Sequence, residues 1–189
     1  MNWIIPGTTL TAQREDTDSL QQQFHAMFLG GGVTLGQITG ITGLDAYVIQ
    51  NWVKRGFLSK PQQKRYSLNQ LCRIITIGML RGVLSMEQIC TLLSYVNGKL
   101  DDEGDDLITD ADLYFLFLHL AAQARDLDTR DQWNQALEAT LDHYQEPVPG
   151  ARQRVKEVLR IMLTAWVASR MAQEAEKMMA ALALPEQEG

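Results

Sequence analysis

The chain has 189 residues, of which 46% are apolar, and a net charge of −6. This length suits one large domain or two small ones, and the apolar content excludes disorder as the default. The charge is segregated: residues 24–98 carry seven basic and two acidic side chains (net +5), whereas residues 99–189 carry nine and eighteen (net −9). Such asymmetry indicates a basic binding module joined to a part with another role.

The helices expected along the chain begin at capping residues and end at glycine, asparagine or proline. The capping residues are Asp16 or Asp18, Thr34, Asp45, Ser67, Ser85, and Thr109 or Asp110. In chain order, we expect an extended arm over 1–15, helices over about 16–29, 35–42 and 46–54, a two-stranded wing around 57–66, and helices over about 68–81, 86–96, 110–124, 129–144 and 151–184.

Membrane and secretion features are missing from this pattern. The N-terminus does not resemble a secretory signal, and the most apolar runs, 74–80 and 113–122, are too short to span a bilayer. Cys72 and Cys90 lie inside apolar helical patterns, so we expect buried free thiols and not a disulfide. These features predict a protein of the reducing cytoplasm that does not contact membranes.

The segment 33–66 carries the most information about function. Two short helices joined at Gly43 form the arrangement that lays one helix in the DNA major groove. The loop that follows contains Lys60, Lys64 and Arg65, which suits a wing that contacts phosphates. A helix pair joined by glycine also occurs in helical domains with no role in DNA binding, so the order of the features favours DNA binding more than the pair does.

This order resembles the DNA-binding domain of the MerR-like regulators, a winged helix-turn-helix followed by a helix pair. The resemblance rests on K-R-G-F-L (54–58), K-R-Y-S-L-N-Q-L (64–71) and G-V-L-S-M-E-Q-I (82–89). Gln50, Asn51 and Trp52 stand where that family usually has an arginine and two aromatic residues. Most of the first 120 residues more closely resemble the bacterial domain of unknown function 1836, which shares this head and the acidic tract L-D-D-E-G-D-D-L-I. That resemblance implies a fold and no function.

Other groups of side chains lack the spacing of a catalytic or metal site. In the acidic tract 101–112 the glycine falls fourth from Asp101, whereas a calcium loop of the EF-hand kind needs glycine sixth and glutamate twelfth. The three histidines are far apart, with no cysteine or glutamate at ligand spacing. We therefore expect a solvated linker in the tract, and neither an enzyme nor a bound metal or cofactor.

Together these features predict an all-α protein with a MerR-like winged helix-turn-helix head. We expect an arm over 1–23, the head over 24–98, and an acidic helical region over 99–189. The predicted function is sequence-specific binding of double-stranded DNA in transcriptional regulation. The predicted base contacts are Gln50 and Asn51, near Tyr47, because side-chain amides can read adenine edges. The predicted phosphate contacts are Lys54, Arg55, Lys60, Lys64, Arg65 and Tyr66.

Two further questions stay open in the sequence. The acidic bulk and the missing arginine also suit a protein-interaction module that kept the fold and lost DNA binding. A homodimer is expected because one head covers only a half-site and two-fold pairing is the commonest symmetry. The helix 151–184 has an apolar stripe for such an interface, which alternatively packs on 110–144 within one chain. The stripe contains Val155, Leu159, Met162, Leu163 and Trp166.

Overall fold

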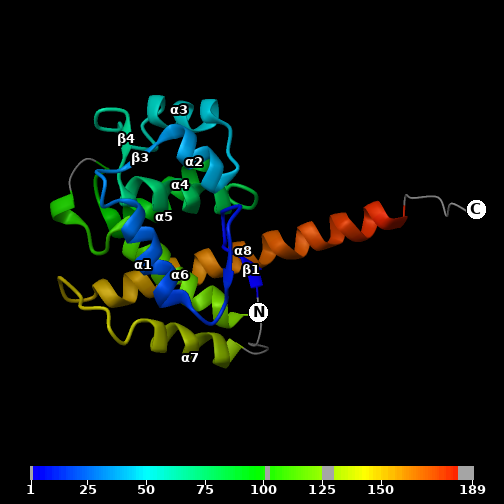
Figure 1. Cartoon of the computed structure of the whole chain (residues 1–189). Helices are drawn as coiled ribbons and strands as arrows, with labels where there is room; N and C mark the ends of the chain where they lie inside the picture. Colours follow the sequence, from blue (N-terminus) through cyan, green and yellow to red (C-terminus); the bar gives the residue numbers. More distant parts are fainter. Residues whose placement is uncertain (1, 101–102, 125–129, 183–189) are drawn as a thin grey trace, which may run out of the picture.

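The computed structural model describes residues 2–100, 103–124 and 130–182 and is mostly helical, in agreement with the predicted all-α class (Figure 1). The elements are β1 (Asn2–Ile4), β2 (Thr11–Gln13), α1 (Thr17–Met27), β3 (Val33–Thr34), α2 (Leu35–Thr42), α3 (Ala46–Lys54), β4 (Arg65–Tyr66), α4 (Leu68–Leu80), α5 (Met86–Asn97), η1 (Glu103–Asp105), α6 (Asp110–Gln123), α7 (Arg130–Thr140) and α8 (Ala151–Leu182). Within the described residues, no helix is long and apolar enough to cross a membrane.

Local capping chemistry explains where the helices begin. Thr34, Ser67 and Ser85 each accept a hydrogen bond from the backbone N–H three residues later, and the glutamine at that position bonds back. Each of these capping boxes satisfies N–H groups that the first turn of a helix leaves without partners. Asp45 occupies the N-cap position of α3 but makes no side-chain capping bond, so the start of α3 depends on its packing.

The strands differ from the predicted arm and wing. The arm folds into a hairpin in which β1 pairs antiparallel with β2. The wing strand β4 pairs with β3, which precedes α2, so the sheet is not confined to 57–66. Gly32 permits this close approach: its φ is +99°, and a Cβ there would lie 2.7 Å from the carbonyl oxygen of Tyr66. Only glycine fits both the backbone conformation and the space.

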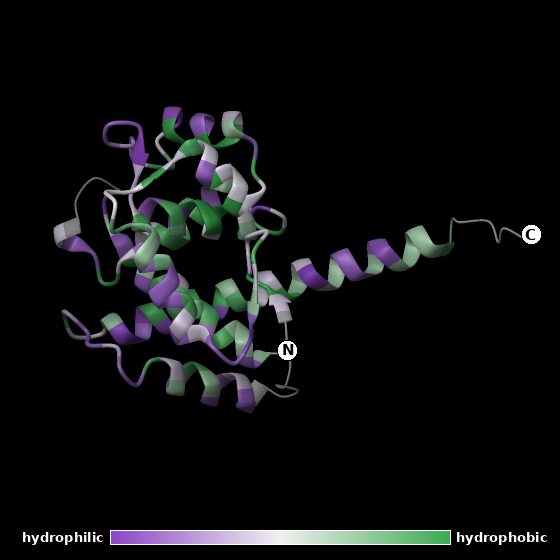
Figure 2. Ribbon diagram, in the orientation of Figure 1, coloured by the Kyte–Doolittle hydropathy of each residue, from purple (hydrophilic) through white to green (hydrophobic). Residues whose placement is uncertain are grey.

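One continuous core joins the predicted head to the C-terminal region. Seven successive residues of α4, from Leu71 to Ile77, are buried, and Figure 2 shows this helix as predominantly hydrophobic. α4 packs on α6, and α8 packs on α4, α5 and α6. Residues from Trp3 to Trp166 belong to the same hydrophobic cluster. The core therefore crosses the predicted boundaries at 23 and 98, and the division of the chain at these positions stays a prediction.

The long helix α8 consists of a packed half and a projecting half (Figure 1). Its predicted apolar stripe, which includes Leu159 and Met162, is buried inside the chain. The intrachain alternative is thus correct for this stripe, because α5 and α6 already cover it. Residues 171–182 are all exposed.

Candidate nucleic-acid interface

The helix pair α2–α3 lies at one end of the molecule, beside the wing (Figure 1). Gly43 ends α2 in the left-handed conformation, with φ +68°, and its N–H donates to the carbonyl of Thr39 at 2.8 Å. Ile49 and Trp52 anchor α3, since their exposed fractions are 0% and 5%. They are three residues apart and share one face of the helix, so the opposite face of α3 is directed to solvent.

The solvent face of α3 carries the residues predicted to contact bases. Tyr47, Gln50, Asn51 and Lys54 follow the i, i+3, i+4, i+7 spacing of a single helical face, and all four are exposed. Tyr47 has an exposed fraction of 69%, which is high for an aromatic side chain. The structure therefore brings these predicted residues together. Arg55 at the end of α3 is also exposed, with its guanidinium 4.6 Å from the centre of the Phe57 ring.

A tight turn forms the tip of the wing. The N–H of Arg65 donates to the carbonyl of Gln62 at 2.8 Å, and the two residues between them have positive φ angles: Gln63 at +48° and Lys64 at +62°. Two left-handed residues in succession define the hairpin turn whose twist matches that of the strands it joins. Gln62, Gln63 and Lys64 are exposed at this tip, and Lys60 is exposed earlier in the same loop.

The structure places Arg65 and Tyr66 differently, with Arg65 exposed and Tyr66 buried. The guanidinium of Arg65 donates to the carbonyl of Gly32 at 2.8 Å, so this side chain ties the wing to the segment before β3. Tyr66 has an exposed fraction of only 4% and packs in the core, and burial raises the pKa of its phenol. Successive side chains of a strand point to opposite sides, which places Arg65 outside and Tyr66 inside. Tyr66 is therefore not part of the exposed contact face.

The electrostatics of this end of the molecule are one-sided. Residues 35–67 contain five basic side chains and a single acidic one, Asp45, which gives a net charge of +4. In the described part of the chain, none of the five basic side chains forms an ion pair. The surface therefore presents cations that no neighbouring carboxylate neutralises.

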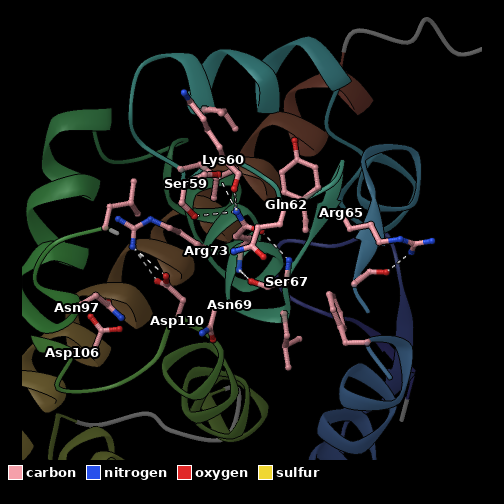
Figure 3. Close-up of a pocket in the computed structure, with 18 of the residues that line it drawn as sticks. Ser59, Lys60, Gln62, Arg65, Ser67, Asn69, Arg73, Asn97, Asp106 and Asp110 are labelled. Carbon is pink, nitrogen blue, oxygen red and sulfur yellow. Dashed lines mark hydrogen bonds and ion pairs between the residues drawn. The ribbon is translucent and has the colours of Figure 1, made fainter. Parts of the chain in front are cut away.

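A depression of about 1200 Å³ lies below the wing, and partly buried hydrogen bonds at its wall hold the loop after α3 (Figure 3). The Nε2 of Gln70 donates to the carbonyl of Ser59 at 3.0 Å, and the Nε of Arg73 donates to the carbonyl of Phe57 at 3.1 Å. Arg73 also pairs with Asp110 at 3.2 Å. These bonds fix the base of the wing to α4 and α6, and therefore set its position relative to α3.

Three residues of this region were not among the predicted site residues: Gly32, Gln63 and Arg73. The only signal for Arg73 was a charge within the apolar run L-C-R-I-I. The pairing that needs Gly32 is non-local, and the turn at Gln63 lacks the glycine or asparagine that marks such turns.

His119 and the two cysteines take part in the packing of the fold. His119 links α6 to α1, because its Nδ1 lies 2.8 Å from the Thr17 hydroxyl and its Nε2 lies 3.4 Å from Asp18. Cys72 and Cys90 are free thiols, the first buried and the second half-buried, and burial raises the pKa of both. Within the described ranges, no group of three or more histidine, cysteine or carboxylate side chains has the geometry of a metal site.

Comparison with known proteins finds similarity to one family over less than half of the chain. The family model of the domain of unknown function DUF1836 matches residues 33–117, which extend from β3 into α6. The uncharacterized protein YkrK of Bacillus subtilis (strain 168) is 31% identical over 81 residues, which are 41% of this chain and 35% of YkrK. The chain thus aligns with about a third of the length of that relative. No solved structure matches the chain. This similarity supports the resemblance to DUF1836 that the motifs of the first 120 residues indicated.

Proposed function

We propose that the chain is a sequence-specific DNA-binding regulator of transcription, with a MerR-like winged helix-turn-helix head that places α3 in the major groove. The observation that carries the proposal is the exposed polar face of α3 beside a basic wing whose cations form no ion pair with any described residue. Lysines held in this way attract phosphates and displace counterions from DNA.

The residues of the interface divide by chemistry. Gln50 and Asn51 carry carboxamides, which pair in bidentate fashion with the N6 and N7 of adenine. Lys54, Lys60 and Lys64 are flexible point charges, suited to phosphates on either side of the groove. Arg55 adds a further phosphate contact from the end of α3. Arg65 acts through the wing, because its guanidinium is bonded to Gly32.

We propose that the protein binds DNA as a homodimer through the projecting half of α8. Ala168, Met171, Ala175 and Met178 are exposed and spaced alternately by three and four residues, and Leu182 continues the series. This spacing is the heptad period of paired helices. Met171, Met178 and Leu182 have exposed fractions of 69%, 65% and 80%. In a two-fold dimer the same stripe covers its own copy.

Charge reversal tests the DNA interface. Lys54→Glu with Lys64→Glu removes two exposed cations whose side chains have no partner among the residues that the structure describes. Binding to all duplexes should weaken, and the slope of log affinity against log salt should fall by about 2, since each phosphate contact contributes roughly 0.9. Fluorescence anisotropy with labelled duplexes gives both quantities. Each reversal is also made singly, and Arg160→Glu on the packed half of α8 is the control for the single variants, because it makes the same charge change at an exposed residue outside the proposed DNA and dimer interfaces. Equal binding by Lys64→Glu and Arg160→Glu would show that the interface is misplaced.

Base readout needs a separate test. Selection from random duplexes with the wild-type protein gives the preferred sequence. Gln50→Ala or Asn51→Ala should reduce the difference in binding free energy between preferred and random DNA by about 1–3 kcal/mol for each lost bidentate pair. If both variants select the same sequence as the wild type, these two side chains do not read bases.

The dimer is tested by light scattering over a range of micromolar concentrations. Met171→Lys with Met178→Lys should produce a folded monomer. Both methionines are exposed and lie outside the core of the chain, so the substitutions charge the proposed interface without disturbing the fold. A wild-type mass that remains at the 21.3 kDa of one chain on every dilution would contradict the dimer.

The second candidate function is a protein-interaction module without DNA binding. The observation that favours it is the net charge of −9 over residues 99–189, since clustered carboxylates repel DNA. This candidate predicts no binding to any duplex even at low salt. The anisotropy experiment therefore separates the two functions.

A further inference from the structure

The wing tip holds two side chains in an unfavourable backbone conformation. Gln63 and Lys64 are the only residues other than glycine with positive φ in the described part of the chain. The left-handed conformation costs a residue with a Cβ roughly 1–2 kcal/mol, which is why glycine, asparagine or aspartate usually occupies such turns. Neither glycine nor asparagine is used here, although either would form the same turn.

Internal contacts do not explain the choice of Gln63. Its side chain is exposed, and within the described residues it takes part in no hydrogen bond or ion pair. Three other glutamines in the same chain, Gln37, Gln70 and Gln88, complete capping boxes. A strained position that keeps a long, unbonded carboxamide at a surface tip is typical of a binding residue.

We propose that Gln63 is a further specificity-determining residue for DNA, which reads the minor groove beside the half-site contacted by α3. The inference rests on the proposed function. The loop that leads to Gln63 starts where α3 ends, so the tip lies beside the helix that would occupy the major groove (Figure 1). In this position the tip meets the neighbouring phosphates and minor groove.

The chemistry of the tip suits that groove. A carboxamide is neutral, so it adds little to phosphate binding, which Lys60 and Lys64 already provide. With its NH2 directed to the floor of the groove, the carboxamide donates to the N3 of adenine and the O2 of thymine, whereas the N2 amino group of guanine is itself a donor and opposes an N–H placed there. Gln63 therefore distinguishes A·T from G·C pairs, and the adjacent Lys64 is attracted by the negative potential of a narrow groove.

The experiment uses the full chain and the duplex selected by the wild-type protein. Replacing adenine by 2,6-diaminopurine in the pairs that flank the half-site adds a minor-groove amino group and leaves the major-groove pattern intact. This change should weaken wild-type binding by roughly three- to tenfold, the range for one hydrogen bond. Gln63→Gly should bind the unmodified duplex more weakly by a similar factor and should no longer respond to diaminopurine. Its melting temperature should stay the same or rise by up to about 3 °C, because glycine relieves the strain.

Lys64→Gly is the matched control, because it relieves the same strain and removes a cation. It should lower the salt slope and keep the response to diaminopurine. Gln63→Asn, which retains the carboxamide and tolerates the left-handed conformation, should keep part of the discrimination. The inference is overturned if wild type and Gln63→Gly bind equally and respond alike to diaminopurine. If the wild-type protein binds no duplex, the proposed function itself fails.

Discussion

Removal of Asp110 should destabilise the whole protein through the buried guanidinium of Arg73. The exposed fractions of the two side chains are 6% for Arg73 and 14% for Asp110, and their closest atoms lie 3.2 Å apart. In Asp110→Ala, the NH1 of Arg73 loses both of its bonds to the carboxylate, and the bond from Nε to Phe57 remains. A buried charge without its counter-ion is the expensive outcome of this change.

The expected magnitude follows from the burial. Breaking a buried ion pair by removal of one partner costs about 3–5 kcal/mol, and the partial exposure of Asp110 places this case at about 3 kcal/mol. Asp110 also lies in the first turn of α6, where a negative charge contributes about 0.5 kcal/mol through the helix dipole. The two contributions sum to about 3.5 kcal/mol, and for a chain of this size 1 kcal/mol shifts the melting temperature by about 2–4 °C, so we expect a fall of about 7–14 °C.

Thermal and urea unfolding followed by circular dichroism measure this effect. Asp110→Asn, which keeps an oxygen acceptor, should fall between wild type and Asp110→Ala. The double variant Arg73→Met with Asp110→Ala should be more stable than Asp110→Ala alone, because no unpaired charge remains in the core. A melting temperature of Asp110→Ala less than about 2 °C below wild type would refute the reasoning, since a loss of even 1 kcal/mol produces a shift of about 2–4 °C. Strict additivity of the single changes would do the same.

Two more predictions concern the wing and the alkaline limit of stability. Gly32→Ala should destabilise the chain by about 1–3 kcal/mol and loosen β3 from β4. Gly31→Ala should cost less, because Gly31 has a φ of +86° but no atom lies within 4 Å of the added Cβ. Equal urea midpoints for the two variants would contradict this. Burial raises the pKa of Cys72 and Tyr114 well above the ordinary 9.0 and 10.0, so the folded chain retains protons that the unfolded chain loses. Stability should therefore hold below about pH 9 and fall as the pH rises further, and a flat urea midpoint across that range would disprove the linkage.

Local chemistry decided how much of the fold was predictable. The helix starts at Thr34, Ser67 and Ser85 were predicted correctly because a capping box lies within four consecutive residues. The β3–β4 pairing was not predicted, because it joins residues 33–34 to 65–66 and depends on the space beside Gly32. Patterns within one helix cannot reveal such an approach.

The candidate site shows the same division. The helical spacing of the apolar residues Ile49 and Trp52 was sufficient to predict that Gln50 and Asn51 face solvent. The orientation of Tyr66 depended on the register of a two-residue strand, in which a shift by one residue exchanges inside for outside. The partner of the apolar stripe in α8 was equally hidden, because a stripe has the same sequence whether it packs on its own chain or on another.

The contacts of the N-terminal hairpin constrain how this chain can be divided and how it is made. The hydroxyl of Thr9 donates to the carbonyl of Gly40 at 2.8 Å, and the buried hydroxyl of Tyr114 donates to the carbonyl of Pro6 at the same distance. The beginning of the chain is thus fastened both to α2 and to a helix more than a hundred residues away. A fragment that starts at residue 24 and stops at residue 98 would lack both fastenings and expose the face of α4 that α6 covers. During synthesis, the first residues can make their contact with α6 only after that helix has left the ribosome. The head therefore completes its folding late in synthesis.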